Sequence, residues 1–150
     1  MILIIALAVF VLDQLTKVYF TKALPLGGSL PVVKGVFHLT LVHNRGAAFG
    51  ILKNQVPVFI FTSLLAIILI FVNFRKNRQK SLYRIALSLI LGGALGNLAD
   101  RLLFGYVIDF LDFRVWPVFN VADSAITVGA TLLALAMLKD KDGCSLRSAE

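Results

Sequence analysis

Four long apolar stretches dominate the chain and are separated by shorter polar segments. They cover about residues 2–20, 57–74, 82–103 and 118–138. A helix needs about 20 largely apolar residues to cross the ~30 Å hydrocarbon core of a bilayer. The pattern therefore predicts an all-α membrane core of four transmembrane helices, with residues 1–150 forming a single domain that ends in a tail at 139–150.

Two of the connections between these helices have the composition of β-strands. After a turn at Gly27 and Gly28, residues 32–42 are rich in β-branched and aromatic side chains, and a second extended stretch covers residues 106–116. We expect a small sheet and loop between the helix ends, partly apolar on both faces and resting at the membrane surface.

Composition and charge fit this picture and add an orientation. Only 15% of the residues are charged, whereas soluble domains carry about 25%. The net charge is +7, and eight of the 15 basic residues lie in the connection 75–84 and in the tail. Because such clusters stay on the cytoplasmic side of a membrane, both termini are predicted to be cytoplasmic and the sheet to lie outside. We interpret the charge as a topology signal, and expect no nucleic acid partner.

Four acidic residues from separate parts of the sequence are predicted to meet near the outer surface. With a helical rise of about 1.5 Å per residue, Asp13 falls in the outer half of the first helix and Asp100 near the outer end of the third. Asp123 opens the fourth helix, and Asp109 is on the connection before it. Ionisable residues within membrane spans usually mark functional sites.

The residues around each acidic side chain indicate that these side chains have different roles. Asp13 and Lys17 are four residues apart, so they can neutralise each other on one helix face. Asp112 shares a strand face with Arg114, since side chains alternate along a strand. Asp109 is on the opposite, apolar face without a local cation. Its pKa is therefore expected to be raised, which suits acid–base chemistry.

Two roles are possible for each of the remaining acidic residues, Asp123 and Asp100. Asn120 and Asp123 can be an ordinary helix cap and first-turn acid, which is compatible with a cap that orients a catalytic carboxylate. Asp100, with Asn97 and Arg101, can be a polar network at a helix end or a clamp for substrate.

Other chemistries are weaker alternatives. His38 and His43 are more typical of the membrane interface than of a metal site, and Ser124 is ordinary in a first helical turn, although a Ser–His–Asp arrangement is conceivable. A proton-coupled transporter with Asp13 and Asp100 on its pathway is a competing class, but the acids gather at one face instead of crossing the membrane. A non-catalytic lipid-binding or assembly protein is a third.

Five short motifs, in this order, resemble the signatures of the prolipoprotein signal peptidases, also called signal peptidase II. They are residues 13–17 (Asp-Gln-Leu-Thr-Lys), 44–50 (Asn-Arg-Gly-Ala-Ala-Phe-Gly), 96–101 (Gly-Asn-Leu-Ala-Asp-Arg), 107–110 (Val-Ile-Asp-Phe) and 119–124 (Phe-Asn-Val-Ala-Asp-Ser). Each motif is weak alone, but together with four spans they cover almost the whole chain and are highly specific.

The resemblance implies a bacterial intramembrane aspartic endopeptidase of the cytoplasmic membrane. Members of the family remove the signal peptide from diacylglyceryl-modified prolipoproteins, cleaving just before the lipidated cysteine, without a metal or other cofactor. The implied partners are these substrates, membrane lipid and globomycin-type inhibitors, and we expect a monomer. The catalytic pair of the family matches Asp109 and Asp123, whose carboxyls would activate water near the outer leaflet.

The other polar residues of the motifs are expected to bind substrate or support the pair. A substrate that unwinds at membrane depth exposes backbone groups that cost several kcal/mol each in lipid. Side chains that satisfy those groups are therefore required. The expected supporting residues are Asn44, Gly46, Asn97, Asp100, Arg101, Asn120, Asp13 and Lys17, while Gly92, Gly93 and Gly96 are expected to allow close helix approach.

Overall fold

Four long helices form the body of the protein, as the sequence predicts. The structure, a computed structural model, describes residues 2–46, 54–76 and 81–147. Each helix is long and apolar enough to cross a membrane, and their outward-facing side chains are mostly apolar and exposed. The helices are α1 (Ile2–Ala23), α2 (Val56–Lys76), α3 (Ser81–Phe104) and α4 (Val121–Arg147).

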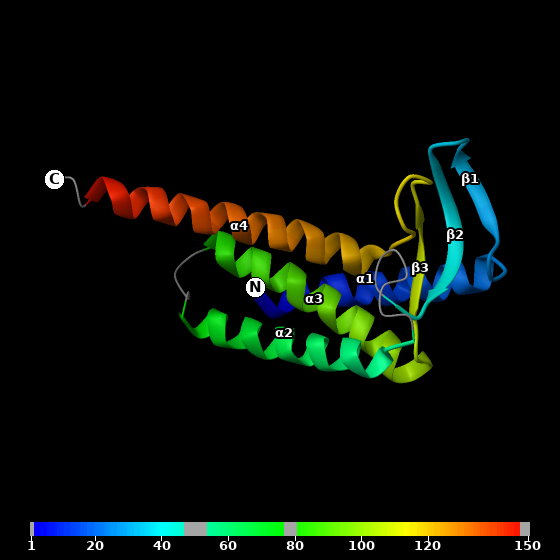
Figure 1. The fold of residues 1–150 in the computed structure, drawn as a ribbon, viewed down its shortest axis with the longest axis horizontal. Helices are drawn as coiled ribbons and strands as arrows, with labels where there is room; N and C mark the ends of the chain where they lie inside the picture. Colours follow the sequence, from blue (N-terminus) through cyan, green and yellow to red (C-terminus); the bar gives the residue numbers. More distant parts are fainter. Residues whose placement is uncertain (1, 47–53, 77–80, 148–150) are drawn as a thin grey trace.

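Helix α3 is the central element, against which α1, α2 and α4 all pack (Figure 1). Small residues on α3 allow this close approach. A Cβ atom on Gly92 would lie 2.6 Å from the carbonyl oxygen of Ala6, and one on Gly93 would collide with the carbonyl oxygen of Ala122. The prediction of close helix approach at these glycines is confirmed.

The predicted sheet is present at one end of the bundle (Figure 1). Its three antiparallel strands are β1 (Ser29–Val33), β2 (Phe37–Asn44) and β3 (Val107–Asp112), in the order β1-β2-β3. The predicted strand boundaries were partly wrong, since residues 32–42 are not one strand. The chain turns between β1 and β2, where Gly35 has a φ of 76°, a conformation that glycine adopts without strain.

In the connection from α3 to α4, the strand is shorter and the loop is longer than the sequence predicted. β3 ends at Asp112, because Arg114 turns back with a φ of 66° and its amide donates to the Asp112 carboxylate. α4 begins at Val121 instead of 118, since the Phe119 amide donates to the carbonyl of Leu111 and extends the sheet by one bridge.

Packing between the sheet and α1 fixes the position of β3. The ring of Phe110 stacks on that of Phe20, with centroids 4.4 Å apart. Because neighbouring residues of a strand point to opposite faces, this contact turns Asp109 away from α1. The strand thereby presents Asp109 toward the start of α4.

Candidate active site

Asp109 is almost fully buried and both of its carboxyl oxygens accept hydrogen bonds. The Asn44 Nδ2 atom donates to Oδ2 at 2.9 Å, and the Asn120 Nδ2 atom donates to Oδ1 at 2.7 Å. Burial and the nearby charge of Asp123 raise the pKa of Asp109 to about 7, although the two amide hydrogen bonds lower it. The expected raised pKa of this carboxyl is confirmed.

Asp123 is in the first turn of α4 and is partly exposed. Its amide donates to the Asn120 Oδ1 atom at 2.9 Å, so Asn120 is the N-cap of the helix, as expected. Its Oδ1 atom accepts a hydrogen bond of 2.7 Å from the Asn97 Nδ2 atom. Within the described part of the chain, Oδ2 accepts no hydrogen bond from another side chain.

Asn120 connects the two aspartates and is completely buried. Its Nδ2 atom donates to Asp109, and also lies 3.1 Å from the Asn97 Oδ1 atom and 3.2 Å from the Ile108 carbonyl oxygen. Its Oδ1 atom meanwhile accepts the amide of Asp123. One side chain therefore fixes both the start of α4 and the carboxylate of Asp109.

A buried ion cluster lies behind this pair. The Lys17 Nζ atom contacts the Asp13 Oδ2 and Asp100 Oδ2 atoms, both at 2.8 Å, and donates to the Asn97 Oδ1 atom at 3.0 Å. The predicted pairing of Asp13 with Lys17 is confirmed. The Lys17 ammonium group also forms an ion pair with Asp100. Because it donates to the side-chain Oδ1 atom of Asn97, the Nδ2 atom of Asn97 points toward Asp123.

The two acids of this cluster also hold backbone groups of the site. Asp100 Oδ2 accepts the amide of Ile108 at 3.0 Å, and Asp13 Oδ1 accepts the amide of Ala122 at 2.9 Å. These hydrogen bonds fix the backbone of Ile108, which precedes Asp109, and of Ala122, which precedes Asp123. Both acidic side chains are fully buried in these contacts.

Gln14 completes the cluster and was not singled out from the sequence. Its Nε2 atom lies 3.0 Å from Asp100 Oδ1, 3.2 Å from Asp13 Oδ2 and 3.3 Å from the Gly96 carbonyl oxygen. The available signal was a polar amide inside a membrane span. The neighbouring Asp13 gives a stronger signal of this kind because it is ionisable.

Asn44 and Arg101 have their polar groups directed by nearby residues. The Gly46 amide donates to Asn44 Oδ1 at 2.9 Å, which leaves the Asn44 amino group for Asp109. Arg101 lies over the Phe59 ring, 4.9 Å from its centroid, and its Nη1 atom is 3.4 Å from the Asn97 carbonyl oxygen. The guanidinium is therefore oriented beside the aspartates.

These side chains surround a pocket of about 330 Å³. The pocket brings together six of the predicted site residues, whereas the four others support its wall from behind. The aromatic side chains of the lining were not predicted as part of the site, because the position of Phe59 depends on how α2 packs on α3 and those of Trp116 and Phe119 depend on how the loop before α4 folds back. The lining includes Asn44, Gly46, Asn97, Arg101, Asp109 and Asp123, with Phe59, Trp116, Pro117, Phe119 and Thr127 among the additional residues.

Asp112 is outside this pocket, as its local partner suggested. It accepts hydrogen bonds from Thr40 at 2.7 Å and from the Arg114 side chain at 3.1 Å. Burial tends to raise its pKa, but the hydrogen bonds from Thr40 and Arg114 outweigh that effect and lower it. The partnership with Arg114 is confirmed, although it forms through a turn instead of along a shared strand face.

The histidines and the serine considered for a metal site or a Ser–His–Asp arrangement make other contacts. His38 lies beside the Ser29 hydroxyl at 3.0 Å, His43 stacks on Tyr106, and the Ser124 hydroxyl donates to the Asn120 carbonyl oxygen at 2.9 Å. Ser124 is therefore not paired with a histidine. Across the described ranges, no three His, Cys, Asp or Glu side chains converge as metal ligands would.

Comparisons with known proteins agree on one family. The family model described as signal peptidase (SPase) II matches residues 5–139. Lipoprotein signal peptidases from Halothermothrix orenii and Moorella thermoacetica are 47% and 50% identical, covering 90% and 91% of this chain and 93% and 91% of their own lengths. A solved bacterial membrane enzyme superimposes with a TM-score of 0.89 at 35% identity, over 95% of this chain and 90% of its own. A second has a TM-score of 0.85 at 36% identity, covering 93% of each chain.

Proposed function

Because the chain belongs to the signal peptidase II family, we propose that it is an intramembrane aspartic endopeptidase acting on diacylglyceryl-modified prolipoproteins. The cleaved bond is the one just before the lipidated cysteine. The observation that carries this proposal is that Asp109 and Asp123 line one pocket while Asn120 hydrogen-bonds to both residues. Four apolar helices and the family make it a multi-pass membrane protein.

The two carboxyls work by sharing one proton. Two neighbouring carboxylates do not both ionise readily, because like charges repel at short range. The raised pKa of Asp109, about 7, supports this arrangement near neutral pH. The pair titrates as a unit, so the proton belongs to both residues.

Hydrolysis then needs no group other than water and this pair. The ionised carboxylate removes a proton from water as the water oxygen attacks the scissile carbonyl carbon. The protonated carboxyl donates a hydrogen bond to the carbonyl oxygen. When the tetrahedral intermediate collapses, a proton passes to the leaving amine of the lipidated cysteine. Acid–base assistance of this kind contributes about 10²–10⁴-fold to the rate.

Orientation of the substrate supplies much of the remaining acceleration. The scissile segment must be extended, which leaves its backbone groups without helical partners at membrane depth. Asn44, Asn97 and Arg101 line the pocket and carry N–H groups that can donate to those carbonyls. Because the protein already holds these side chains in place, binding requires little rearrangement.

The proposed setting is the bacterial cytoplasmic membrane, with both termini in the cytoplasm and the pocket toward the outer leaflet. Dense basic residues in the connection 75–84 and in the tail support this orientation. We further propose that the chain acts as one domain and as a monomer, in contact with membrane lipid and without a cofactor. Globomycin-type peptides are expected to inhibit it by occupying the pocket.

A cleavage assay with purified protein in detergent tests this function. The substrate is a synthetic peptide that contains a diacylglyceryl cysteine and the residues around the scissile bond, and mass spectrometry identifies the products. We expect a product whose new N-terminus is the lipidated cysteine, and no cleavage of the same peptide without the diacylglyceryl group. Cleavage elsewhere, or indifference to the lipid, would contradict the proposed substrate.

A further inference from the structure

An apolar groove lies between α1 and α2 and shares no residue with the catalytic pocket. It has a volume of about 420 Å³, and α3 forms its floor. Ala6 and Leu91 are buried at the bottom of the groove, whereas Leu3, Leu7 and Phe71 at its rim are exposed. The lining residues are Leu3, Ala6, Leu7 and Phe10 of α1, Phe71 of α2, and Leu91 and Leu95 of α3.

The packing of the helices leaves this groove open on its outer side. α1 and α2 both pack on α3 but have almost no contact with each other. The lining residues of α1 recur at intervals of three and four positions, so they share one helix face. In a membrane, the groove therefore faces the hydrocarbon of the bilayer.

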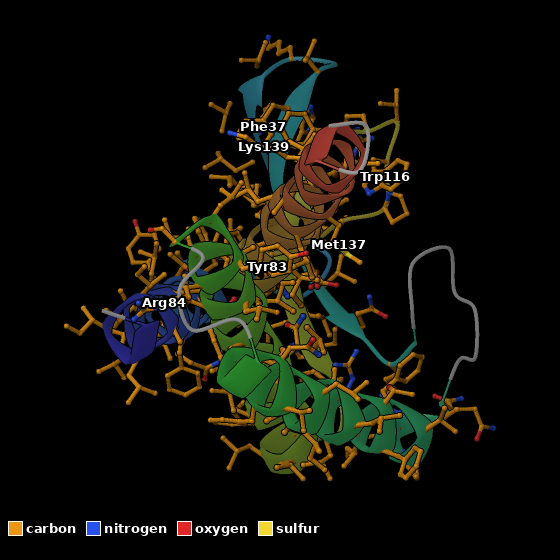
Figure 2. The ribbon with its side chains drawn as sticks, turned by 90° about the vertical axis from the view of Figure 1, so that its left-hand side faces the viewer. Phe37, Tyr83, Arg84, Trp116, Met137 and Lys139 are labelled. Atoms are coloured by element: carbon orange, nitrogen blue, oxygen red, sulfur yellow. The ribbon has the colours of Figure 1, made fainter. Side chains whose placement is uncertain are left out.

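Arg84 lies on the same face of α3 as the floor of the groove. Residues that are four, three and four positions apart form one row along a helix. This row consists of Arg84, Ser88, Leu91 and Leu95. Arg84 is in the first turn of α3, at the end of the bundle remote from the sheet, and Figure 2 shows it beside the N-terminal end of α1. The side chain of Arg84 therefore lies at that end of the groove.

The guanidinium group of Arg84 is poorly satisfied by the protein itself. Its Nε atom is buried and has no hydrogen-bond partner within the described ranges. Arg84 also forms no ion pair with a described acidic side chain. A buried donor without an acceptor is unfavourable, and a charge removed from water without a counter-ion is more so. An anion from outside the protein would satisfy both requirements.

The surroundings of Arg84 also favour an anion. The first turn of α3 contains no acidic residue, although its free backbone N–H groups and the helix dipole carry positive charge there. The connection 75–84 has five basic residues in its sequence, Arg84 among them. Basic sites between helices at the cytoplasmic side of a membrane are typical binding sites of anionic lipid head groups.

The length and the lining of the groove favour an acyl chain over a helix. From Arg84 to Leu95, α3 rises about 17 Å, which is roughly half of the ~30 Å hydrocarbon core and therefore the depth of one leaflet. Docking of another helix is favoured by small residues that let the two backbones approach closely. The exposed rim carries leucine and phenylalanine instead, and a thin, flexible chain fits between these side chains.

We propose that this groove binds one acyl chain of an anionic phospholipid from the cytoplasmic leaflet, and that the lipid phosphate accepts hydrogen bonds from Arg84. The planar guanidinium group matches the oxygens of a phosphate. The site goes beyond the proposed function, since it is separate from Asp109 and Asp123, and it depends only on the membrane orientation proposed above. Such a lipid bridges α1 and α2, which barely touch, so its binding should stabilise the bundle.

Titration of lipid onto the purified protein in detergent tests the role of Arg84. Native mass spectrometry gives the dissociation constants of phosphatidylglycerol, which is anionic, and of phosphatidylcholine with the same acyl chains, which has no net charge. We expect the wild type to bind phosphatidylglycerol at least about fivefold more tightly, the scale of one basic residue at an anionic lipid surface. Arg84→Gln should bind both lipids equally, whereas Arg84→Lys should keep part of the preference because it retains the charge.

Lys139→Gln is the matched control for charge. Lys139 is exposed at the same end of the bundle but belongs to α4, on the other side of α3 (Figure 2). Its replacement should leave the lipid preference unchanged. Equal binding of the two lipids by the wild type, or a preference that survives in Arg84→Gln, would overturn the proposal. A preference lost equally in Lys139→Gln would also overturn it, because general positive charge would then explain the binding.

A second pair of variants tests the groove and decides the matter if Arg84→Gln does not fold. Leu7→Trp fills the groove, while Leu12→Trp changes a similarly exposed leucine of α1 that does not line it. We expect Leu7→Trp to weaken phosphatidylglycerol binding by about tenfold, the scale on which overpacking acts. It should also remove the rise in unfolding temperature that this lipid gives the wild type and Leu12→Trp. Binding by Leu7→Trp equal to that of the wild type, or a wild-type dimer without bound lipid, would contradict the proposed site.

Cleavage of a lipidated peptide by the same variants keeps this inference separate from the proposed function. The Arg84 and Leu7 substitutions change no residue of the catalytic pocket, so both variants should cleave the peptide like the wild type in detergent. Loss of lipid preference with intact cleavage supports the lipid site. If the wild type does not cleave the peptide, the proposed function fails, while the lipid titrations still decide the present proposal.

Discussion

The side chain of Asn120 illustrates how much one residue contributes to this site. It caps α4, donates to Asp109 and contacts Asn97, all from a fully buried position. The sequence allowed its capping role to be predicted, because Asn before a helix with an acid in the first turn is a local signal. Its contact with Asp109 could not be predicted, since it requires β3 to lie beside the start of α4.

Replacing Asn120 should affect activity more than folding. Loss of a cap costs about 1 kcal/mol, whereas misplacing a reacting group by about 1 Å can cost 10²-fold in rate. We therefore expect Asn120→Ala to remain folded and to lose about 10²-fold in kcat. Cleavage kinetics and thermal unfolding measure the two effects. A variant with wild-type kcat would show that Asn120 has no positioning role.

Asn44 provides a test of the shared proton through pH. Its hydrogen bond lowers the pKa of Asp109, so its removal in Asn44→Ala should raise that pKa above about 7. Activity needs the proton on the pair, and it is lost as pH rises through this pKa. The alkaline limb of kcat/KM should therefore move to higher pH in the variant. A limb that stays in place or moves to lower pH would contradict this assignment.

Asp112→Asn is the matched control for these variants. Asp112 is outside the pocket, and its lowered pKa reflects Thr40 and Arg114. The variant should retain most of its activity and an unchanged alkaline limb. Because the pKa of Asp112 is lower in the folded protein than in the unfolded chain, its ionised carboxylate stabilises the fold at pH values above the unfolded-state pKa. This stabilisation is lost as the pH falls through the folded-state pKa.

At the scale of elements, the site depends on α1 and α3 holding the backbones of β3 and α4. Asp100 accepts the Ile108 amide and Asp13 accepts the Ala122 amide, while Lys17 contacts both carboxylates. The Asp13–Lys17 contact is local and was predictable from its spacing. The contact of Lys17 with Asp100 was not predictable, because it depends on the packing of α1 against α3.

Removing Lys17 should destabilise the bundle. Lys17→Met leaves two carboxylates and the Asn97 carbonyl without their shared donor, and breaking a buried ion pair costs about 3–5 kcal/mol. We expect a markedly lower unfolding temperature in detergent, measured by the fluorescence of Trp116. Leu15→Met, at an exposed site on the same helix, is the control. An unfolding temperature equal to that of the wild type would show that the cluster does not stabilise the fold.

At the scale of the whole molecule, the buried charges gather where the helices meet the sheet. The buried charged residues of the described structure are Asp13, Lys17, Asp100, Asp109 and Asp112. A proton pathway would place such groups along the length of the bundle, so this arrangement favours a site at one face. Hydropathy predicted the four spans. It could not reveal that α1, α2 and α4 all pack on α3, because side chains that face lipid and side chains that face another helix are both apolar in the sequence.

A chelator gives a simple test of the whole chemistry. Water attack by two carboxyls requires no metal, so EDTA should leave the cleavage rate unchanged. Addition of zinc after EDTA treatment is the control for removal. Loss of activity that zinc restores would revive a metal role for His38 or His43.

The most direct test of the account is whether Asp109 and Asp123 act as one catalytic unit. Cleavage of a lipidated prolipoprotein peptide is measured for Asp109→Asn, Asp123→Asn and the double variant. We predict losses of at least about 10³-fold for each single variant and no further loss in the double variant, because residues that act together are not additive. Normal cleavage by Asp109→Asn, with activity lost instead in Asp100→Asn, would contradict the account.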